Sequence, residues 1–591
     1  MSSTKKPSLI TPEEFASSLN LDRFKLNLLA TPLMKLLRID KINDVYNKAR
    51  QHPGLGFIDR GLQEFNVTYE VPPEELANLP TDRPFITVSN HPYGGIDGMI
   101  LIAAIAGVRP EFKVMVNYIL QAFEEVQQYF ISVNPFDNIT NKQVNVSAIK
   151  AVLEHLKQGH PIGIFPAGEV SAFQTDSRRV MDREWHPLVG KIIAKAKVDV
   201  VPVYFAGGNS LFFNLLGLIH PSLRTARLPS EMFKVKETVH VRIGKPISPK
   251  QLAEFADSDQ MLRYLRAKTY ALGSPLKLKP FFFRNPLGFL SKPEPIVEPT
   301  PLDKLLTDLA NIRSRDIICS MQNFEVFLSE APQIPNILRE IGRLREITFR
   351  EEGEGTNHSI DIDEYDIHYN HLFIWDTEAQ RIVGAYRIGK GKDLYDKFKI
   401  KGFYLHELFT IDKKFAPILK RSLEMGRSFI VADYQRKHIS LLLLWKGILI
   451  TVRKNPGYRY LIGPVSISNN FSNLSKELLV KVIMDNYFDH DLAKLIKPRR
   501  KFKAKLNDSE LLLLPKHNDI KELDLLIAEI ESTHSKLPVL LKKYILQLNS
   551  KIIGFNVDPK FNNALDGFII MDLEKVPAEV FKMVDKEGLF H

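Results

Sequence analysis

The sequence predicts an α/β protein made of two successive domains, and three observations support this prediction. The chain has 591 residues, which is too long for a single hydrophobic core. Between residues 83 and 249, short apolar runs alternate with segments of helical periodicity, as in a mostly parallel sheet covered by helices. A proline-rich stretch at 276–301 then separates this part from a second half with its own pair of predicted strands.

Strands and helices of the first half follow from the pattern of apolar residues. The run at 99–106 predicts a buried helix, and the spacing of Val146, Ile149, Val152, Leu153 and Leu156 predicts an amphipathic one that stops at Gly159. Because loops at the strand ends of such a sheet carry the ligand sites, we expect functional residues there. The predicted strands are 85–88, 112–116, 162–165, 198–205 and 238–243.

Four segments are expected along the chain: an amphipathic helical region at 1–60, a first domain at 61–275, a Pro/Phe-rich linker at 276–301 and a second domain at 302–591. The apolar face of the first segment either packs on the body of the protein or lies in a membrane interface. Within the linker, PFFFRNPLGF places aromatic side chains beside an arginine. That composition suits a membrane interface and equally a seam between domains.

Composition limits the classes of function. A net charge of +11 favours an acidic partner such as nucleic acid, anionic lipid or an acidic protein, but no nucleic-acid-binding motif is present, so we expect no nucleic acid. With Cys319 as the one cysteine, no disulfide framework or cysteine-ligated zinc is possible, and without HExxH or a phosphate loop we expect no metal and no cofactor. Lacking a signal peptide or a transmembrane run, the protein is expected in the cytoplasm, bound peripherally to the inner face of the membrane.

The segment SNHPYGGIDG, residues 89–98, combines a histidine and an aspartate in a glycine-rich turn between a predicted strand and a predicted helix. An imidazole takes up a proton near neutral pH, and a carboxylate on its other nitrogen fixes its tautomer. His91 and Asp97 therefore have the chemistry to activate a hydroxyl for attack on an acyl carbonyl. The alternative is a loop histidine beside an aspartate that caps a helix.

This segment resembles the first motif of the glycerolipid (lysophosphatidic acid) acyltransferase family, with five intervening residues where that family usually has four. Two later segments resemble further motifs of the family, FPAGEVS at 165–171 and VVPVYFAG at 200–207. The resemblance implies an O-acyltransferase in which His91 and Asp97 are catalytic. It also implies that substrate contacts come from Gly94, Gly95, Phe165, Pro166, Gly168, Glu169 and Ser171.

One position departs from the family pattern. The family's arginine, which is taken to hold the acceptor's phosphate, is Val170 here, and valine cannot bind a phosphate. Glu169 is suited to an ammonium group instead, although Arg178 or Arg179 is close enough in sequence to replace the missing charge. We therefore expect this half to prefer a zwitterionic or carboxylate-bearing lyso-aminolipid over lysophosphatidic acid.

In the second half, residues 372–375 and 382–387 predict a strand hairpin, preceded by an acidic loop with Asp363 and Asp366. Arg345 and Arg387 are available to pair with these carboxylates. Glu424 and Arg427 follow in an E-x-x-R arrangement, in which a glutamate can take the proton of an attacking amine. The alternative is that these charges form a buried ion-pair network that holds the loops.

Several stretches of this half, among them LREITFREEG at 344–353 and LEMGRSFI at 423–430, resemble the GNAT-fold group of acyl-homoserine-lactone synthases and bacterial ornithine N-acyltransferases. Residues 537–562 resemble the ornithine N-acyltransferase branch in particular. The resemblance implies that Glu424 is the catalytic base. It implies substrate binding by Arg345, Asp363, Asp366, Arg387 and Arg427.

Together the two resemblances imply a bifunctional enzyme that makes an amino-acid-based membrane lipid, an ornithine lipid or a related aminolipid such as a glycine lipid. The second half would N-acylate the amino acid from acyl-acyl carrier protein or acyl-CoA, and the first half would O-acylate the hydroxyl of that acyl chain. The expected partners are acyl carrier protein, an anionic membrane surface, and lipid and amino-acid substrates. Alternatives are a lysophospholipid O-acyltransferase with a carrier-binding module, and a non-enzymatic membrane scaffold.

Overall fold

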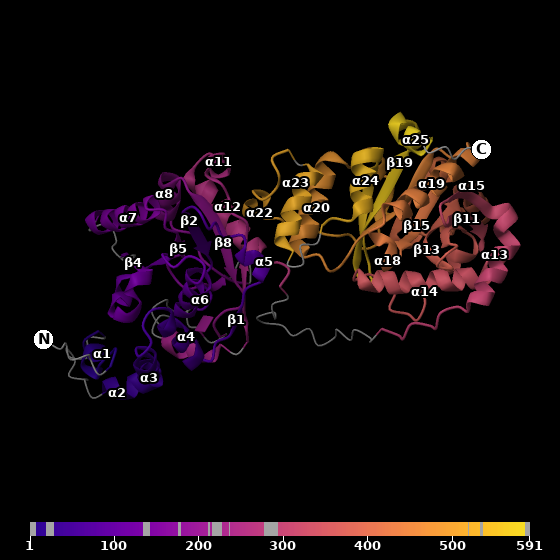
Figure 1. The fold of residues 1–591 in the computed structure, drawn as a ribbon. Coiled ribbons are helices and arrows are strands. Elements are labelled where there is room, and N and C mark those ends of the chain that lie inside the picture. The colour runs from indigo at the N-terminus through magenta and orange to yellow at the C-terminus, as the bar shows by residue number, and fades with distance from the viewer. Residues whose placement is uncertain are drawn as a thin grey trace. The chain divides into compact units, whose positions relative to one another are not determined.

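The structure, a computed structural model of the chain, has two compact units, each an α/β assembly as the sequence predicted (Figure 1). The first unit comprises Met1–Pro286 with Asn507–Leu513 and Glu529–Ser532, and the second comprises the remaining residues. The residues described are 8–18, 29–133, 142–174, 179–210, 213–214, 227–235, 237–276, 293–517, 519–531 and 536–585. The PFFFRNPLGF stretch at 280–289 lies outside them.

A seven-stranded sheet forms the centre of the first unit, in the order β1-β9-β8-β2-β5-β3-β4. All neighbours are parallel except β8 and β9, which confirms the mostly parallel sheet. The edge strands β1 and β4 were not predicted because they are too short to show a periodicity. The bounds are β1 Tyr69–Glu70, β2 Phe85–Ser89, β3 Lys113–Asn117, β4 Phe130–Val133, β5 Ile162–Ile164, β8 Asp199–Phe205 and β9 Val239–Ile243.

Helices cover both faces of this sheet. On one face lie α3 (Ile39–Ala49), α4 (Leu55–Glu64) and α6 (Gly95–Ala106), and the last of these is the helix predicted from the apolar run. On the other face lie α7, α8 and α12. Since β2 and β5 are parallel, the loops that follow them leave the sheet at the same edge. The other bounds are α1 Pro12–Ser18, α2 Ala30–Leu36, α5 Pro73–Leu76, α7 Lys142–Lys157, β6 Ala172–Gln174, β7 Arg179–Met181, α8 Pro187–Ala196, α11 Pro249–Leu252 and α12 Ser258–Ala271.

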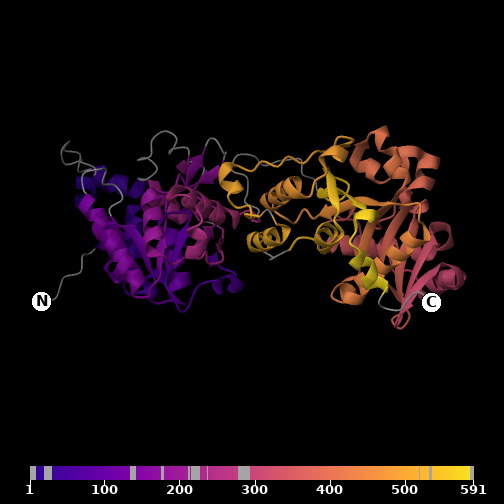
Figure 2. The same cartoon turned by 90° about the horizontal axis from the view of Figure 1, so that it is seen from above.

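The second unit is built on an eight-stranded sheet in the order β10-β11-β12-β13-β15-β16-β19-β18, seen from a second direction in Figure 2. The predicted hairpin is present as β12 and β13. Every neighbouring pair is antiparallel except β15 and β16. The bounds are β10 Ile317–Met321, β11 Phe324–Glu330, β12 Asn370–Asp376, β13 Arg381–Lys390, β15 Ser422–Ile430, β16 Tyr460–Ile467, β18 Lys551–Asp558 and β19 Ala564–Asp572.

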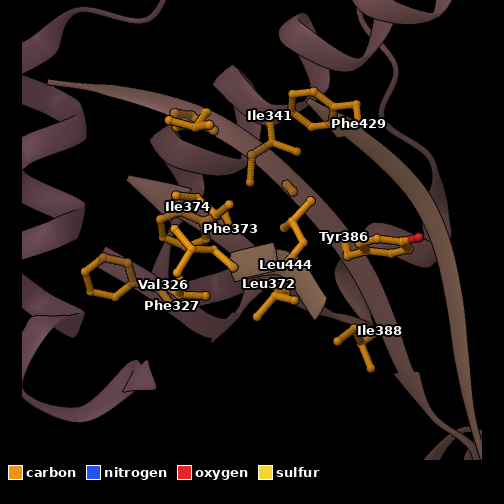
Figure 3. Packing of buried hydrophobic residues seen from close by; sticks show 14 of the residues in the cluster. Val326, Phe327, Ile341, Leu372, Phe373, Ile374, Tyr386, Ile388, Phe429 and Leu444 are labelled. Carbon is orange, nitrogen blue, oxygen red and sulfur yellow. The ribbon is translucent and has the colours of Figure 1, made fainter. Parts of the chain in front are cut away.

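Apolar side chains of the strands pack with those of the neighbouring helices into one buried cluster (Figure 3). Phe327 and Phe373, which are register partners, stack with ring centroids 5.2 Å apart. The main helices are α13 Leu302–Asp316, α14 Pro335–Glu351, α19 His438–Lys454, α20 Asn473–Asn486, α23 Ile520–Ile530, α24 Val539–Leu548 and α25 Ala578–Asp585. Shorter elements are α15 Gly391–Phe398, α16 Leu405–Leu408, β14 Phe409–Ile411, α17 Ala416–Lys420, α18 Ala432–Gln435, α21 His490–Ala493, β17 Ile496–Pro498 and α22 Asp508–Leu511.

The parallel strands β15 and β16 part after a short pairing. They pair from Ser422 with Tyr460 to Glu424 with Ile462, after which β15 continues along β13 and β16 continues along β19. The result is a wedge in the sheet that opens directly after Glu424. Among the described residues, no helix has the length and apolarity needed to cross a membrane.

We predict that Gly463→Ala destabilises the second unit, because an added Cβ would overlap the backbone carbonyl oxygen of Met425 at the point where the wedge opens. The expected loss is about 1–3 kcal/mol of unfolding free energy, the usual cost of overpacking. Urea unfolding of the full chain, followed by tryptophan fluorescence, to which Trp375 and Trp445 of the second unit contribute, measures it. Gly457→Ala is the matched control, because its Cβ would meet nothing within 4 Å. Equal stability of the two variants would contradict the prediction.

Two candidate active sites

His91, in the loop after β2, and Asp97, in the first turn of α6, lie together. The Nδ1 atom of His91 is 3.1 Å from Oδ2 of Asp97. The same carboxylate oxygen accepts hydrogen bonds from the backbone amides of Tyr93 and Gly94, at 2.8 and 3.0 Å. Asp97 therefore caps α6 and orients the imidazole at the same time, and the catalytic role of the pair stays a prediction.

The surroundings of this pair are apolar. Asp97 is fully buried, and burial raises the pKa of its carboxyl while the hydrogen bond from His91 lowers it. The imidazole packs against the ring of Phe165, with centroids 4.2 Å apart and planes inclined by 30°. Because Asp97 occupies Nδ1, the other ring nitrogen, Nε2, is left for a substrate hydroxyl. His91 stays 18% exposed, which allows such contact.

Gly94 and Gly95 lie at the close of the turn that leads into α6. Gly94 has φ of +77°, a conformation that favours glycine, and its amide donates to Asp97. A Cβ on Gly94 would lie 3.1 Å from Leu228 and 3.2 Å from Val170. Gly95 follows as the first residue of α6. Val170 therefore packs beside the His91 turn and presents a methyl group where the family has an arginine.

The loop after β5 lies against the His91 loop, which confirms that both share one edge of the sheet. Ser171 donates its backbone amide to the carbonyl of His91 at 2.8 Å. Pro166 accepts from the amide of His186 at 2.9 Å, and Gly168 adopts φ of +68°. Glu169 lies 3.4 Å from Arg183 in an ion pair. Of the two arginines that could replace the missing charge, Arg179 is exposed on β7 and Arg178 lies outside the described residues.

In the second unit, the predicted charged residues form a buried network. Arg345 donates to both carboxylate oxygens of Asp366, each at 2.9 Å. Arg387 donates to Asp363 at 2.5 Å and lies 3.3 Å from Asp366. These contacts are those of the ion-pair network that the sequence left open as an alternative. A role of these four residues in substrate binding stays a prediction.

Arg427 differs from the other two arginines because it lies where β15 and β16 part. Its side chain is 11% exposed, against 1% for Arg345 and Arg387. The guanidinium lies over the rings of Tyr404 and Phe561, 5.0 and 4.8 Å from their centroids, and Nε is 3.3 Å from Asp361. Of the three, Arg427 is therefore best placed to meet a ligand carboxylate.

Glu424 lies at the closed end of the wedge and is buried. It accepts hydrogen bonds from the hydroxyl of Tyr369 and from the backbone amides of Tyr404 and Leu405, the latter two at 3.1 and 2.8 Å. Burial raises the pKa of the Glu424 carboxyl to about 7, although the bond from Tyr369 lowers it. The group can therefore take up and release a proton near neutral pH.

Other residues near these sites were not predicted from the sequence. Glu354 and Asp566 adjoin Arg427, whose charge lowers the pKa of each, but burial together with neighbouring carboxylates raises them to about 8 and about 7. Asp182 contacts both loops of the first site, and Tyr369 contacts Glu424. No motif marks these residues, since they reach the sites only through the fold. Within the described ranges, no group of three His, Cys, Asp or Glu side chains is arranged to hold a metal ion.

An oriented His–Asp pair at a sheet edge and a buried glutamate in the second sheet are arrangements that can serve acyl transfer, and comparison with known proteins identifies the chain as an acyltransferase with two domains. Residues 15–278 match the acyltransferase family model, and residues 344–446 match the acetyltransferase (GNAT) domain model. The lyso-glycine lipid O-acyltransferase of Bacteroides thetaiotaomicron is 30% identical over 41% of this chain and 88% of its own length. The chain thus belongs to the family of that acyltransferase through its first half, which is joined to a GNAT domain.

A second relative from Bacteroides thetaiotaomicron matches 48% of this chain. It is a glycine N(alpha)-acyltransferase, 27% identical over 296 residues and 87% of its own length. A solved structure, the 1-acyl-sn-glycerophosphate acyltransferase of Thermotoga maritima, covers 40% of this chain and 81% of its own, at 18% identity and a TM-score of 0.23. That score is too low to bear on function.

We predict that Arg345→Gln strongly destabilises the second unit, because Asp366 would lose its bidentate partner while remaining buried. Breaking one side of a buried ion pair costs about 3–5 kcal/mol. Urea unfolding of the full chain measures the change. Arg313→Gln serves as control, since Arg313 pairs with Glu325 while 52% exposed, and such pairs contribute about 0–1 kcal/mol. A cost for Arg345→Gln as small as that of the control would contradict the prediction.

Proposed function

We propose that this protein makes an amino-acid-based membrane lipid in two steps, with one step in each unit. The second unit N-acylates a small amino acid, glycine or ornithine, and the first unit O-acylates the hydroxyl of that acyl chain. The observation that carries the proposal is that an acyltransferase model matches residues 15–278 and a GNAT model matches residues 344–446, while the relatives include both an N-acyltransferase and an O-acyltransferase. Each half also has a candidate base, His91 in the loop after β2 and Glu424 within β15.

For O-acyl transfer, His91 acts as the general base. Its Nε2 takes the proton of the acceptor hydroxyl, the oxygen attacks the thioester carbonyl of the donor, and the carbon–sulfur bond breaks. The imidazolium then returns the proton to the thiolate that leaves. Asp97 holds the ring through Nδ1 and stabilises its charged form. Because Val170 provides no charge beside the turn, we propose a lyso-aminolipid acceptor rather than a phosphate-bearing one.

For N-acyl transfer, Glu424 takes the proton of the attacking amine, directly or through water. The nitrogen forms the amide bond, the thioester bond breaks, and the proton passes to the leaving thiolate. Arg427, held between two aromatic rings at the wedge, binds the carboxylate of the amino acid.

Acyl-acyl carrier protein is the proposed donor, with acyl-CoA as the alternative, because the net charge of +11 attracts an acidic partner. The same charge favours an anionic membrane surface, which is where an acceptor lipid would be found. We propose that the enzyme works at the cytoplasmic face of the membrane. Neither step requires a metal or a redox cofactor.

Expression of the chain in a bacterium that lacks aminolipids tests the proposal. The expected result is a new phosphorus-free lipid with one amide-linked and one ester-linked acyl chain, identified by mass spectrometry of lipid extracts. New phospholipid species alone would replace the proposal with a lysophospholipid O-acyltransferase that carries an acyl-carrier-binding module. Unchanged lipids, despite soluble folded protein and a supply of donor, would favour a non-enzymatic scaffold.

We predict that His91→Ala halts the pathway after its first step. The mono-acylated amide accumulates and the di-acylated lipid disappears, because the O-transfer base is lost while the second unit is untouched. Mass spectrometry of both lipids measures the outcome. The control is His52→Ala, which changes an exposed histidine of the same unit and leaves both products unchanged. Undiminished di-acylated lipid from His91→Ala would remove His91 from the mechanism.

A pH profile tests the role of Glu424. N-acylation by the full chain should rise as the pH passes about 7, because the ionised carboxylate is the base. Tyr369→Phe should shift the midpoint to higher pH, since the lost hydroxyl stabilises the charged form and lowers the pKa. Glu424→Gln should abolish both lipids, and synthetic N-acyl amino acid should restore O-acylation. A midpoint that does not move in Tyr369→Phe would show that Glu424 only holds the turn at Tyr404.

A further inference from the structure

Asp182 is a buried carboxylate that contacts the two loops of the first active site. It follows the short hairpin of β6 and β7, in which Ala172 pairs with Met181. Because of this pairing, Ser171 and Asp182 leave the hairpin side by side, although 10 residues separate them. Asp182 is only 1% exposed.

Its side chain connects the loops through direct hydrogen bonds. Oδ1 accepts from the hydroxyl of Ser171 at 2.5 Å and from the backbone amide of His91 at 3.2 Å. Ser171 also donates its own amide to the carbonyl of His91 at 2.8 Å. The backbone amide of His91 is therefore held by Asp182 and its carbonyl by Ser171, while Asp97 holds its ring.

The rest of Asp182 is anchored to helices of the same unit. Oδ2 accepts from Nε1 of Trp185 at 3.1 Å, next to the start of α8. The backbone amide of Asp182 donates to the hydroxyl of Tyr270 at 2.7 Å, and Arg266 donates to its carbonyl at 2.6 Å. Tyr270 and Arg266 both lie on α12, so the position of Asp182 is fixed from outside the two loops.

Burial of the Asp182 carboxylate costs free energy, and packing alone would not require a charged group at this position. Burial raises the pKa of the Asp182 carboxyl, and within the described residues no lysine or arginine forms an ion pair with the carboxylate. The hydrogen bonds from Ser171, Trp185 and His91 lower the pKa and compensate. All of them come from groups that are fixed in the fold, which makes the carboxylate a rigid link between the loops.

We propose that Asp182 is a positioning residue for O-acyl transfer. It holds the backbone of His91 against the Ser171 loop, so that the imidazole stays between Asp97 and Phe165 while the proton moves. It contacts no substrate and exchanges no proton in the reaction. The proposal rests on the role of His91 as base in the proposed function.

Asp182→Ala in the full chain tests it by steady-state O-acylation of a synthetic N-acyl amino acid that carries a hydroxyl. The turnover number should fall by about 100-fold, the usual effect of a small misplacement of a catalytic group, while KM for the acceptor changes less than about twofold. Circular dichroism and the melting temperature verify folding. Tyr270→Phe is the control, since it removes one contact to the Asp182 backbone only, and should lower turnover less than about threefold.

A second pair of variants separates positioning from folding. In Asp182→Asn, the amide NH₂ must face either the Nε1 proton of Trp185 or the donors of the loops, so one donor is opposed by another donor. Trp185→Phe removes the first of these donors. The variant with both changes should therefore regain turnover to within about fivefold of Trp185→Phe alone, whereas Asp182→Asn alone should not.

Turnover of folded Asp182→Ala within about threefold of the unchanged enzyme would overturn the proposal. Failure of Trp185→Phe to rescue Asp182→Asn would overturn it as well, including in the case where Asp182→Ala does not fold. His91→Ala, measured in parallel, distinguishes this outcome from a failure of the proposed function. If His91→Ala also keeps its activity, O-transfer does not use this site at all.

Discussion

Both units depend on a carboxylate that is buried beside a turn and stabilised by backbone amides. Asp97 accepts from the amides of Tyr93 and Gly94, and Glu424 accepts from those of Tyr404 and Leu405. A buried carboxylate without such donors would be too costly to keep. Because backbone amides have fixed directions, each carboxylate also fixes the loop that donates to it, and the side chains of that loop are then held for chemistry.

The two buried carboxylates face different side chains. Asp97 faces an imidazole, and in the proposed mechanism the proton is exchanged at His91. Glu424 faces a tyrosine hydroxyl, and burial raises the pKa of its own carboxyl to about 7, so in the proposed mechanism the proton is exchanged at the glutamate itself. The same type of interaction thus supports the proposal of a histidine base in one unit and a carboxylate base in the other.

Each site lies where a sheet changes its pairing or ends. In the first unit the parallel strands β2 and β5 end at one edge, and their loops meet through Ser171 and His91. In the second unit the pairing of the parallel strands β15 and β16 ends at Glu424, and Arg427 follows on β15.

The sequence by itself determined the α/β class, the hairpin of β12 and β13, and the His91 and Asp97 pair, because these depend on residues that are close along the chain. Apolar periodicity, turn composition and a motif of ten residues are local signals. The tertiary structure decided which distant residues complete the sites. Asp182 reaches His91 through a hairpin, and Glu354 after α14 and Asp566 on β19, more than two hundred residues apart, both come near Arg427 on β15. No local pattern encodes such contacts, because burial and charge at these positions arise only when the strands are assembled.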